Sequence, residues 1–509
     1  MEDDLGNIIS DHSQKADLIW RSFKERLSSS DFTNILFDLA SHFVNTPDLS
    51  DLVQPFTKIE IDAVVKHLPS NKAPGPDGFN TDFIKHCWHI VAPDFYLLCE
   101  AFFSGPSVYK VSTPPHITLI QKKDDAMKIS DYRPISLLNT SVKIITKLLA
   151  NRLQDKLPLL LHKNQYGFIR NRSIQDCVSW ALEYLHTCHQ TKNEILILKL
   201  DFEKAFDKVE HEFMLQIMRH KGFPDKWLDW MQAIFKSGTS SVLLNGVLGE
   251  VFHCKRGVRQ GDPLSPLLFV LAGDFLQTIL NGARQKNQFT LIISIPSDDE
   301  FPILQYADDT LIFLKADLNE LNTLKDILTK FATSAGLRVN LQKSMMVPIN
   351  VSEERLQILA SSFGCAKGNL PFTYLGLPLS TSKPTVADFW PLVSKCERRL
   401  VAFSSFLNEA GRLELTNAVI SALPTYAMCT FLLPKTVIKQ INKYRKHCLW
   451  RGSDLNSKKP PKAAWPLVCV PKTEGGMGVL NLSVQNESLL LKHLHKFYTK
   501  AQVPWVQLV

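Results

Sequence analysis

Apolar and polar positions follow two different spacings along the chain, and together they predict a mixed α/β protein. Nearly continuous apolar runs at 116–121 and 195–200 have the length and composition of strands, and the second is typical of a sheet covered by helices. Apolar positions three and four residues apart predict helices instead. One or two helices are expected within residues 14–45. Single helices are expected at 59–68, 140–157, 173–187, 265–280 and 318–335, and the last of them ends at Gly336. After Val386 the pattern is again helical.

One stretch combines the strand pattern with an acidic tip. Apolar runs at 301–304 and 311–314 flank Gln305-Tyr306-Ala307-Asp308-Asp309-Thr310, which is the pattern of a β-hairpin. The adjacent carboxylates repel each other, so a compensating charge is expected, and a divalent cation is the usual one. Taken alone, an Asp-Asp pair is more often part of a solvated turn.

A third carboxylate comes directly after the apolar run 195–200. Asp201 is followed by Phe202-Glu203-Lys204-Ala205-Phe206-Asp207-Lys208-Val209. A carboxylate at the end of a buried strand is held rigidly and suits a site that needs a fixed charge. The alternative is that Asp201 caps the N-terminus of a following helix.

Two loops are dense in glycine and proline. Residues 71–79 (NKAPGPDGF) form an irregular loop whose backbone amides and lysine suit contact with phosphates. Residues 256–266 (RGVRQGDPLSP) combine glycine flexibility with two arginines and Gln260. Ser265 is predicted as the N-cap of the following helix, with Pro266 at its first position. The second loop is therefore a candidate site for an anion or a nucleotide at a helix N-terminus.

Further cations precede and follow these segments. Lys122, Lys123 and Arg170 are compatible with ordinary solvated surfaces. Arg133 differs, because Pro134 fixes the local backbone and the guanidinium is a rigid fork for phosphate oxygens. Residues 337–340 are predicted as a strand, and residues 372–379 as a short hairpin.

Composition narrows the class of protein. The chain has 509 residues, 45% hydrophobic and 21% charged, which is globular and long enough for about three domains. No uninterrupted apolar run reaches the roughly 18 residues of a membrane span, and the acidic N-terminus is not a secretory signal. The ten cysteines are scattered without a C-x-x-C pair. This usage predicts a reduced intracellular setting, with neither a disulfide framework nor a zinc site.

The net charge of +8 is unevenly distributed. Residues 1–70 hold six Lys/Arg and twelve Asp/Glu, a balance of −6, whereas residues 383–472 hold fifteen and five, a balance of +10. Aromatic residues lie among the late lysines, as in 443–451 (KYRKHCLWR). Such a region suits a polyanion such as nucleic acid, with a solvated basic surface and core aromatics as the alternative.

The motifs, taken in order, resemble the reverse transcriptase of a non-LTR (LINE-type) retrotransposon of the kind abundant in plants. The resemblance runs from residue 71 to about residue 450. The segments that carry it are DYRPISLLN, QYGFIRNRS, LKLDFEKAFDKV, RGVRQGDPLSPLLF, YADD, GLRVNLQKS and FTYLGLPLS.

This resemblance implies an RNA-directed DNA polymerase that uses two Mg²⁺ ions. Asp201 and Asp308 would be the principal ligands, with Asp309 completing the triad. Phe206 would clash with a ribose 2′-hydroxyl and so select deoxynucleotides, although it also has the spacing of a core residue. Gln260 and Gly261 would lie beneath the incoming base and sugar.

Other roles follow from the same resemblance. Arg133, with Lys122 or Lys123, would grip the triphosphate. Lys343 would protonate the departing pyrophosphate, with a plain surface lysine as the alternative. Residues 372–379 would be the primer grip.

The implied fold is an α/β (α+β) right-hand polymerase with fingers, palm and thumb, the palm built on an antiparallel sheet. The expected division is an N-terminal helical extension (1–70), fingers and palm (71–380), and a basic helical thumb with a truncated C-terminal extension (381–509). Members of this type usually carry an upstream endonuclease. Residues 1–70 contain no hydrolase-like carboxylate and histidine set, so a degenerate copy, a truncated copy or a gene-model fragment is expected.

The expected partners are an RNA template, a DNA primer or target, and dNTPs, in the nucleus or the cytoplasm and without a membrane; no oligomeric state is indicated. Two alternatives remain open. An RNA-dependent RNA polymerase uses a similar palm, although Phe206 argues against it. A catalytically silent relic could bind RNA through the basic C-terminal half.

Overall fold

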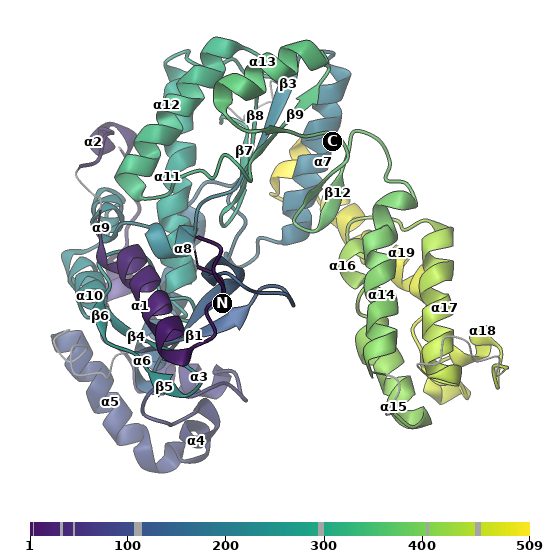
Figure 1. The fold of residues 1–509 in the computed structure, drawn as a ribbon, viewed down its shortest axis with the longest axis horizontal. Helices are drawn as coiled ribbons and strands as arrows, with labels where there is room; N and C mark the ends of the chain where they lie inside the picture. The colour runs from purple at the N-terminus through teal and green to yellow at the C-terminus, as the bar shows by residue number, and fades with distance from the viewer. Residues whose placement is uncertain are drawn as a thin grey trace. The chain divides into compact units, whose positions relative to one another are not determined.

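The computed structural model describes residues 1–3, 5–30, 34–43, 46–105, 115–293, 300–403, 407–452 and 460–509. These residues form two compact units (Figure 1). Unit 1 comprises Met1–Arg172, Glu194–Ile292 and Asp299–Lys367, and unit 2 comprises chiefly Ser173–Asn193 and Gly368–Val509. The predicted division into 1–70, 71–380 and 381–509 is based on sequence features rather than on compactness in space. The two units do not test it, and it stays a prediction. Parts of the predicted helical stretches, at 31–33, 44–45 and 453–459, lie outside the described residues.

The central sheet of unit 1 has the order β10-β9-β3-β8-β7. Its strands are β3 (Ile195–Leu200), β7 (Ile303–Tyr306), β8 (Asp309–Lys315), β9 (Met345–Ile349) and β10 (Ala366–Lys367). All neighbouring pairs are antiparallel except β9 with β10. Five of the six residues of β3 are buried, as its apolar run predicts, because helices of the same unit cover the sheet.

A second sheet in unit 1 has the order β2-β1-β4-β5, with β6 also paired to β4. Its strands are β1 (His116–Gln121), β2 (Tyr132–Leu137), β4 (Thr239–Leu244), β5 (Val247–Leu248) and β6 (Phe252–His253). The pairing of Gln121 with Tyr132 brings Lys122 and Arg133 to the same end of the β1–β2 pair.

Helix α11 (Ser265–Gln285), most of whose residues are buried, packs against α2, α6, α9 and α12. By length and composition α11 could cross a membrane, but 83% of its apolar window is buried inside the protein. The helices of unit 1 are α1 (His12–Ser28), α2 (Leu39–His42), α3 (Lys58–His67), α4 (Thr81–His86), α5 (Trp88–Ser104), α6 (Thr140–Leu160), α8 (Ala205–Lys208), α9 (His211–His220), α10 (Asp225–Lys236), α11 (Ser265–Gln285), α12 (Leu318–Ala335) and α13 (Glu353–Phe363).

Unit 2 is largely helical and has a separate apolar core. Its elements are α7 (Ile174–Gln190), β11 (Phe372–Tyr374), β12 (Leu377–Leu379), α14 (Trp390–Phe403), α15 (Glu409–Glu414), α16 (Thr425–Met428), α17 (Lys435–Arg451), α18 (Trp465–Val468) and α19 (Leu482–Tyr498). The buried Asp176 of α7 accepts hydrogen bonds from Lys496 Nζ (2.6 Å) and Trp505 Nε1 (2.8 Å). These bonds tie α7 to the C-terminal segment despite the long stretch of chain between them.

Most predicted elements are confirmed, and two details are wrong. The strands at 116–121 and 195–200, the 372–379 hairpin and the Gly336 end of α12 (φ +76°) all appear. Residues 337–340 do not form a strand: Val339 makes only an isolated bridge with Phe202, and the paired strand is β9 further on. Ser265 is the first residue of α11 rather than its N-cap: the N-cap is Leu264, which has no side-chain cap hydrogen bond and whose own N donates to Asp262 Oδ1 (3.0 Å).

Candidate active site

The acidic hairpin tip is a two-residue turn. Tyr306 pairs with Asp309 across β7 and β8, so Ala307 and Asp308 form the turn itself. Ala307 has φ +56°, a left-handed conformation that costs a non-glycine residue about 1–2 kcal/mol. A two-residue hairpin turn commonly has a positive φ at its first central residue. Because that residue is alanine rather than glycine, surrounding contacts are needed to offset the strain.

Those contacts come from the segment 164–167, whose role no local sequence pattern indicates. Gln165 Oε1 accepts from Ala307 N (3.0 Å) and from Gly167 N (2.9 Å). A Cβ atom on Gly167 would lie 2.4 Å from Ala307 N, so only glycine allows this approach. Tyr166 N also donates to Gln305 O (2.8 Å). The segment is therefore a clamp that fixes the acidic tip.

Sheet register brings the third carboxylate to the same place. Leu200 pairs with Thr310, so Asp201 emerges from β3 beside the hairpin tip. Asp201 is not a helix cap, since the next helix, α8, starts at Ala205 with Lys204 before it. Its backbone is fixed instead by Asn340 N, which donates to Asp201 O (2.7 Å), and by Ser344 Oγ, which accepts from Asp201 N (3.1 Å).

Each of the two carboxyl groups at the hairpin tip, Asp308 and Asp309, has a pKa raised above its ordinary value. Desolvation raises the pKa of the Asp308 carboxyl, and repulsion from Asp309 and Asp201 raises it further. Desolvation and Asp201 also raise the pKa of Asp309, against an opposing effect of Lys199. A cation placed between these groups would reverse the shifts, because an opposite charge favours the ionised carboxylate.

Eight of the nine predicted site residues line one cavity of about 650 Å³ in unit 1. They are Lys122, Arg133, Asp201, Phe206, Gln260, Gly261, Asp308 and Lys343. Asp309 is the exception: it is exposed at the start of β8 and is not among the lining residues. The loop 71–79 does not line the cavity either; its Asp77 N donates to Asn139 Oδ1 (3.2 Å) before α6.

The cavity wall carries an excess of positive charge. Its cations are Arg26, Lys122, Arg133, Lys204, Arg259 and Lys343, against the carboxylates of Asp201, Asp207 and Asp308. Burial and neighbouring cations, including Arg26, lower the pKa of Lys204 to about 8. The pKa of Lys122 is also lowered, by burial and then by Arg133 and Lys343. Cations that raise one another's energy in this way suit a polyanionic ligand.

Phe206 packs in the core and also borders the cavity. Its ring stacks on Phe269 (centroids 4.5 Å apart, 19° between planes) and meets Phe168 edge-on (6.3 Å, 82°). The same residue lines the cavity and is half-buried. Core packing therefore fixes the ring on one side while its other side is available to a ligand.

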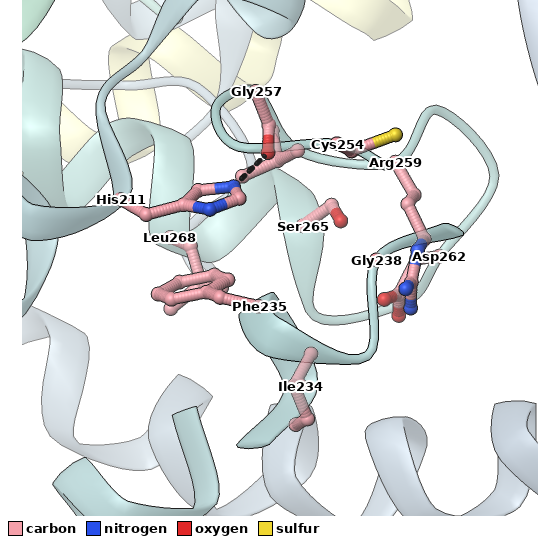
Figure 2. Close-up of a pocket in the computed structure, with 11 residues that line it drawn as sticks. His211, Ile234, Phe235, Gly238, Cys254, Gly257, Arg259, Asp262, Ser265 and Leu268 are labelled. Carbon is pink, nitrogen blue, oxygen red and sulfur yellow. Dashed lines mark hydrogen bonds between the residues drawn. The ribbon is translucent and has the colours of Figure 1, made fainter. Parts of the chain in front are cut away.

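The glycine-rich loop 256–262 is bound tightly to its surroundings. Gly257 (φ +79°) lies so close to the chain that an added Cβ would be 2.6 Å from Asp207 O. Beneath it is a small cavity of about 30 Å³, in which His211 Nε2 donates to Gly257 O (2.7 Å; Figure 2). Burial lowers the pKa of His211 to about 4, so at neutral pH its imidazole is uncharged, stacked on Phe235 with centroids 4.3 Å apart.

A second cationic surface lies on α17 in unit 2. A cavity of about 390 Å³ is lined by Lys439, Asn442, Lys443, Lys446, His447, Trp450, Arg451 and Pro461. Of the aromatic residues that the sequence singles out here, Tyr444 is buried in the core and Trp450 lines this cavity. Tyr444 therefore fits the core alternative, whereas a role of Trp450 in stacking on nucleic acid stays a prediction.

Comparison with known proteins identifies the family. The sequence model described as "Reverse transcriptase (RNA-dependent DNA polymerase)" matches residues 120–379, just over half of the 509 residues. The chain belongs to the reverse transcriptase family. The matched range contains all nine residues predicted for the reverse transcriptase site, and the predicted right-hand polymerase fold is that of this family.

The related proteins come from transposable elements. The chain is 27% identical over 464 residues to "Transposon TX1 uncharacterized 149 kDa protein" of Xenopus laevis, covering 90% of this chain and 34% of that protein. It is 29% identical over 270 residues to the Pol polyprotein of retrotransposable element R2DM of Drosophila melanogaster (51% and 24%). A Pol polyprotein of element R2 of Popillia japonica is 25% identical over 300 residues (59% and 40%). The chain thus spans between about a quarter and two fifths of these relatives, and the predicted relation to non-LTR retrotransposons is confirmed.

The site residues supply the type of ligand that a divalent cation prefers, but not a ready-made cluster of three ligands. Within the described ranges, no three His, Cys, Asp or Glu side chains converge closely enough to hold an ion by themselves. Asp201 and Asp308 nevertheless face the same cavity, and carboxylate oxygens are the ligands that hard divalent cations prefer. Asp201 raises the pKa of Asp308 by charge repulsion, and a bound cation would relieve this repulsion. Reverse transcriptases as a family use divalent metal ions.

Proposed function

We propose that this chain is the RNA-directed DNA polymerase of a LINE-type retroelement, extending a primer 3′-hydroxyl on an RNA template with dNTPs. The observation that carries the proposal is the convergence of eight predicted residues, drawn from separate segments, on one cavity of about 650 Å³. Its combination of carboxylates, cations and an aromatic ring matches the needs of nucleotidyl transfer, which depends mainly on positioning and charge stabilisation.

Two Mg²⁺ ions are the proposed cofactors, held by Asp201 and Asp308 with Asp309 at the edge. Bound there, Mg²⁺ would activate the attacking hydroxyl and stabilise the pyrophosphate leaving group. The protein's own groups would do the rest. Arg133 and Lys122 bind the triphosphate, Lys343 supplies a proton to the departing pyrophosphate, and Phe206 excludes a ribose 2′-hydroxyl.

The proposed partners are an RNA template, a DNA primer and dNTPs, in the nucleus or cytoplasm. The α17 surface supports a nucleic-acid partner independently of the cavity. Its helix contains six Lys/Arg residues and no Asp or Glu, and Lys439, Lys443 and Lys446 share one face. Phosphate contacts from such a face, with Trp450 available for stacking on bases, suit a single strand or a hybrid.

A homopolymer assay tests the proposal. The purified chain should extend oligo(dT) on poly(rA) with dTTP and Mg²⁺, and Asp308→Ala should reduce the rate at least about a thousandfold. Asp326→Ala, which removes an exposed carboxylate on α12, is the matched control and should retain the wild-type rate. Undiminished extension by Asp308→Ala would overturn the proposal.

A catalytically silent RNA-binding relic is the second candidate, and the α17 surface is the observation that favours it. Binding and extension measured on one sample separate the two candidates. RNA affinity without any extension, in a sample with a cooperative thermal transition, would support the relic.

A further inference from the structure

The N-terminal helix α1 lies outside the matched range 120–379, yet its C-terminal end is built into the candidate active site. In Figure 1 it lies beside α8 and β4, and it contacts both of them. Lys255 N donates to Leu27 O (2.7 Å), and Arg256 Nε donates to Arg26 O (2.8 Å). The last carbonyls of a helix need such donors, so the glycine-rich loop caps α1.

Arg26 extends from this helix end into the cavity. It is 7% exposed, and its Nη1 donates to Asp207 Oδ2 (3.2 Å). Its guanidinium lies over the ring of Phe23, 4.6 Å from the centroid, which fixes the plane of the side chain. Arg26 and Asp207 together line the cavity that holds Asp201 and Asp308.

Asp207 also forms a hydrogen bond with the glycine-rich loop. Gln260 Nε2 donates to Asp207 Oδ1 (3.2 Å), so one carboxylate joins Arg26 to Gln260. An ionised carboxylate only accepts hydrogen bonds, so Gln260 must turn its NH₂ group toward Asp207 and its carbonyl oxygen away from it.

We propose that Arg26 is a positioning residue for the nucleotide site: its hydrogen-bonded ion pair holds the Asp207 carboxylate in place and thereby fixes the orientation of the Gln260 amide toward the incoming nucleotide. This inference rests on the proposed polymerase function. It makes α1 part of the nucleotide-binding machinery, and it predicts that Arg26 affects nucleotide affinity more than the rate of the chemical step.

Steady-state kinetics with a double-mutant cycle test the inference. Arg26→Gln should raise the KM for dTTP about tenfold and change kcat less than threefold, and Gln260→Ala should have a similar effect. Combined, the two substitutions should raise KM no further than Gln260→Ala alone, since they act through one contact. Arg26→Lys, which retains the charge, should stay within about threefold of wild type.

Arg21→Gln is the matched control, because Arg21 is an exposed arginine on the same helix and forms a surface ion pair with Asp17. It should have wild-type kinetics. If the effects of Arg26→Gln and Gln260→Ala multiply, or if Arg26→Gln lowers kcat with KM unchanged, Arg26 does not act through Gln260 and the inference fails.

Loss of a buried positive charge could unfold the protein, so a second variant is needed. Arg26→Gln/Asp207→Asn removes both charges and leaves no buried ion unpaired. It should melt near the wild-type temperature and still show the raised KM, because the amide introduced by Asp207→Asn can hydrogen-bond Gln260 in either orientation. A wild-type KM in this variant would also overturn the inference.

Direct binding separates this inference from the proposed function. If the wild type does not extend primers, the polymerase proposal fails while dTTP binding in Mg²⁺ can still be titrated calorimetrically. Weaker dTTP binding by Arg26→Gln than by Arg21→Gln would then support the role of Arg26. Equal binding by the two variants would contradict it.

Discussion

The cavity of unit 1 and the α17 surface of unit 2 are both rich in cations, but the structural elements that supply these cations differ. The cavity takes its cations from separate segments, and several of them are desolvated and shift one another's pKa. The α17 surface takes most of its cations from one helix, at the spacing of a single face. Small displacements should therefore disable the cavity, whereas charges on α17 should contribute independently and additively.

The clamp on the hairpin tip is where this contrast should be largest. Gly167→Ala places a Cβ 2.4 Å from Ala307 N and should displace Asp308. We expect kcat to fall about a hundredfold or more, since a displacement of about 1 Å at a catalytic group has that effect. Gly105→Ala, where an added Cβ meets nothing within 4 Å, should be neutral in the same extension assay. A fully active Gly167→Ala enzyme would show that the cavity tolerates displacement.

Phe206 tests whether core packing and substrate selection share one ring. Phe206→Ala should raise the kcat/KM for ribonucleotides relative to deoxynucleotides about tenfold to a hundredfold, because the obstruction to the 2′-hydroxyl is lost. It should also lower stability by about 3 kcal/mol through lost contact with Phe269. Competing incorporation of UTP and dTTP measures the first effect and denaturant unfolding the second. Destabilisation without any change in sugar selection would reduce Phe206 to a core residue.

The α17 surface should show graded behaviour. Substituting Lys439, Lys443 and Lys446 together by Gln should flatten the slope of log affinity against log salt concentration by about 2–3, since each phosphate contact contributes about 0.7–0.9. Affinity for a primer–template should fall about tenfold at moderate salt, with kcat at saturation unchanged. Lys66, Lys286 and Lys315, exposed lysines elsewhere, form the matched triple control. Equal losses in both triples would mean that α17 is not a specific binding surface.

The smallest expected effect is the contribution of Lys204 to the pH dependence of nucleotide binding. Its pKa of about 8 lies below the usual value of 10.5, so the folded protein disfavours its charged form, and its contribution to stability becomes more favourable as pH rises from about 8 toward 10.5. Binding of the triphosphate should change in the opposite direction, because the cavity loses a positive charge above about pH 8. We expect the KM for dTTP to rise about threefold between pH 7 and pH 9, relative to Lys204→Arg, whose charge does not titrate in this range. Parallel pH profiles of the two proteins would contradict this role.

Much of the candidate site was predictable because its parts are local. The hairpin, the strand before Asp201 and the glycine-rich loop each have a pattern within a few residues. The clamp by Gln165 was not predictable from the QYGF segment, since its partner Ala307 lies 142 positions away. The strand predicted at 337–340 was wrong because an alternating pattern does not say whether a neighbouring strand is present to pair with.

The motif resemblance implied the polymerase fold and several of the nine candidate residues, while periodicity and residue chemistry by themselves predicted the mixed α/β class and the acidic hairpin. They also determined the cationic face of α17, because the period of one helix is enough to place its lysines together. Only the tertiary structure decided that Asp309 lies off the cavity wall, that Phe206 both packs on Phe269 and lines the cavity, and that Arg26 reaches Asp207 across 181 positions. The physical reason is that hydrogen bonds and charge pairs between distant segments depend on sheet register and helix docking, which leave no local pattern in the sequence.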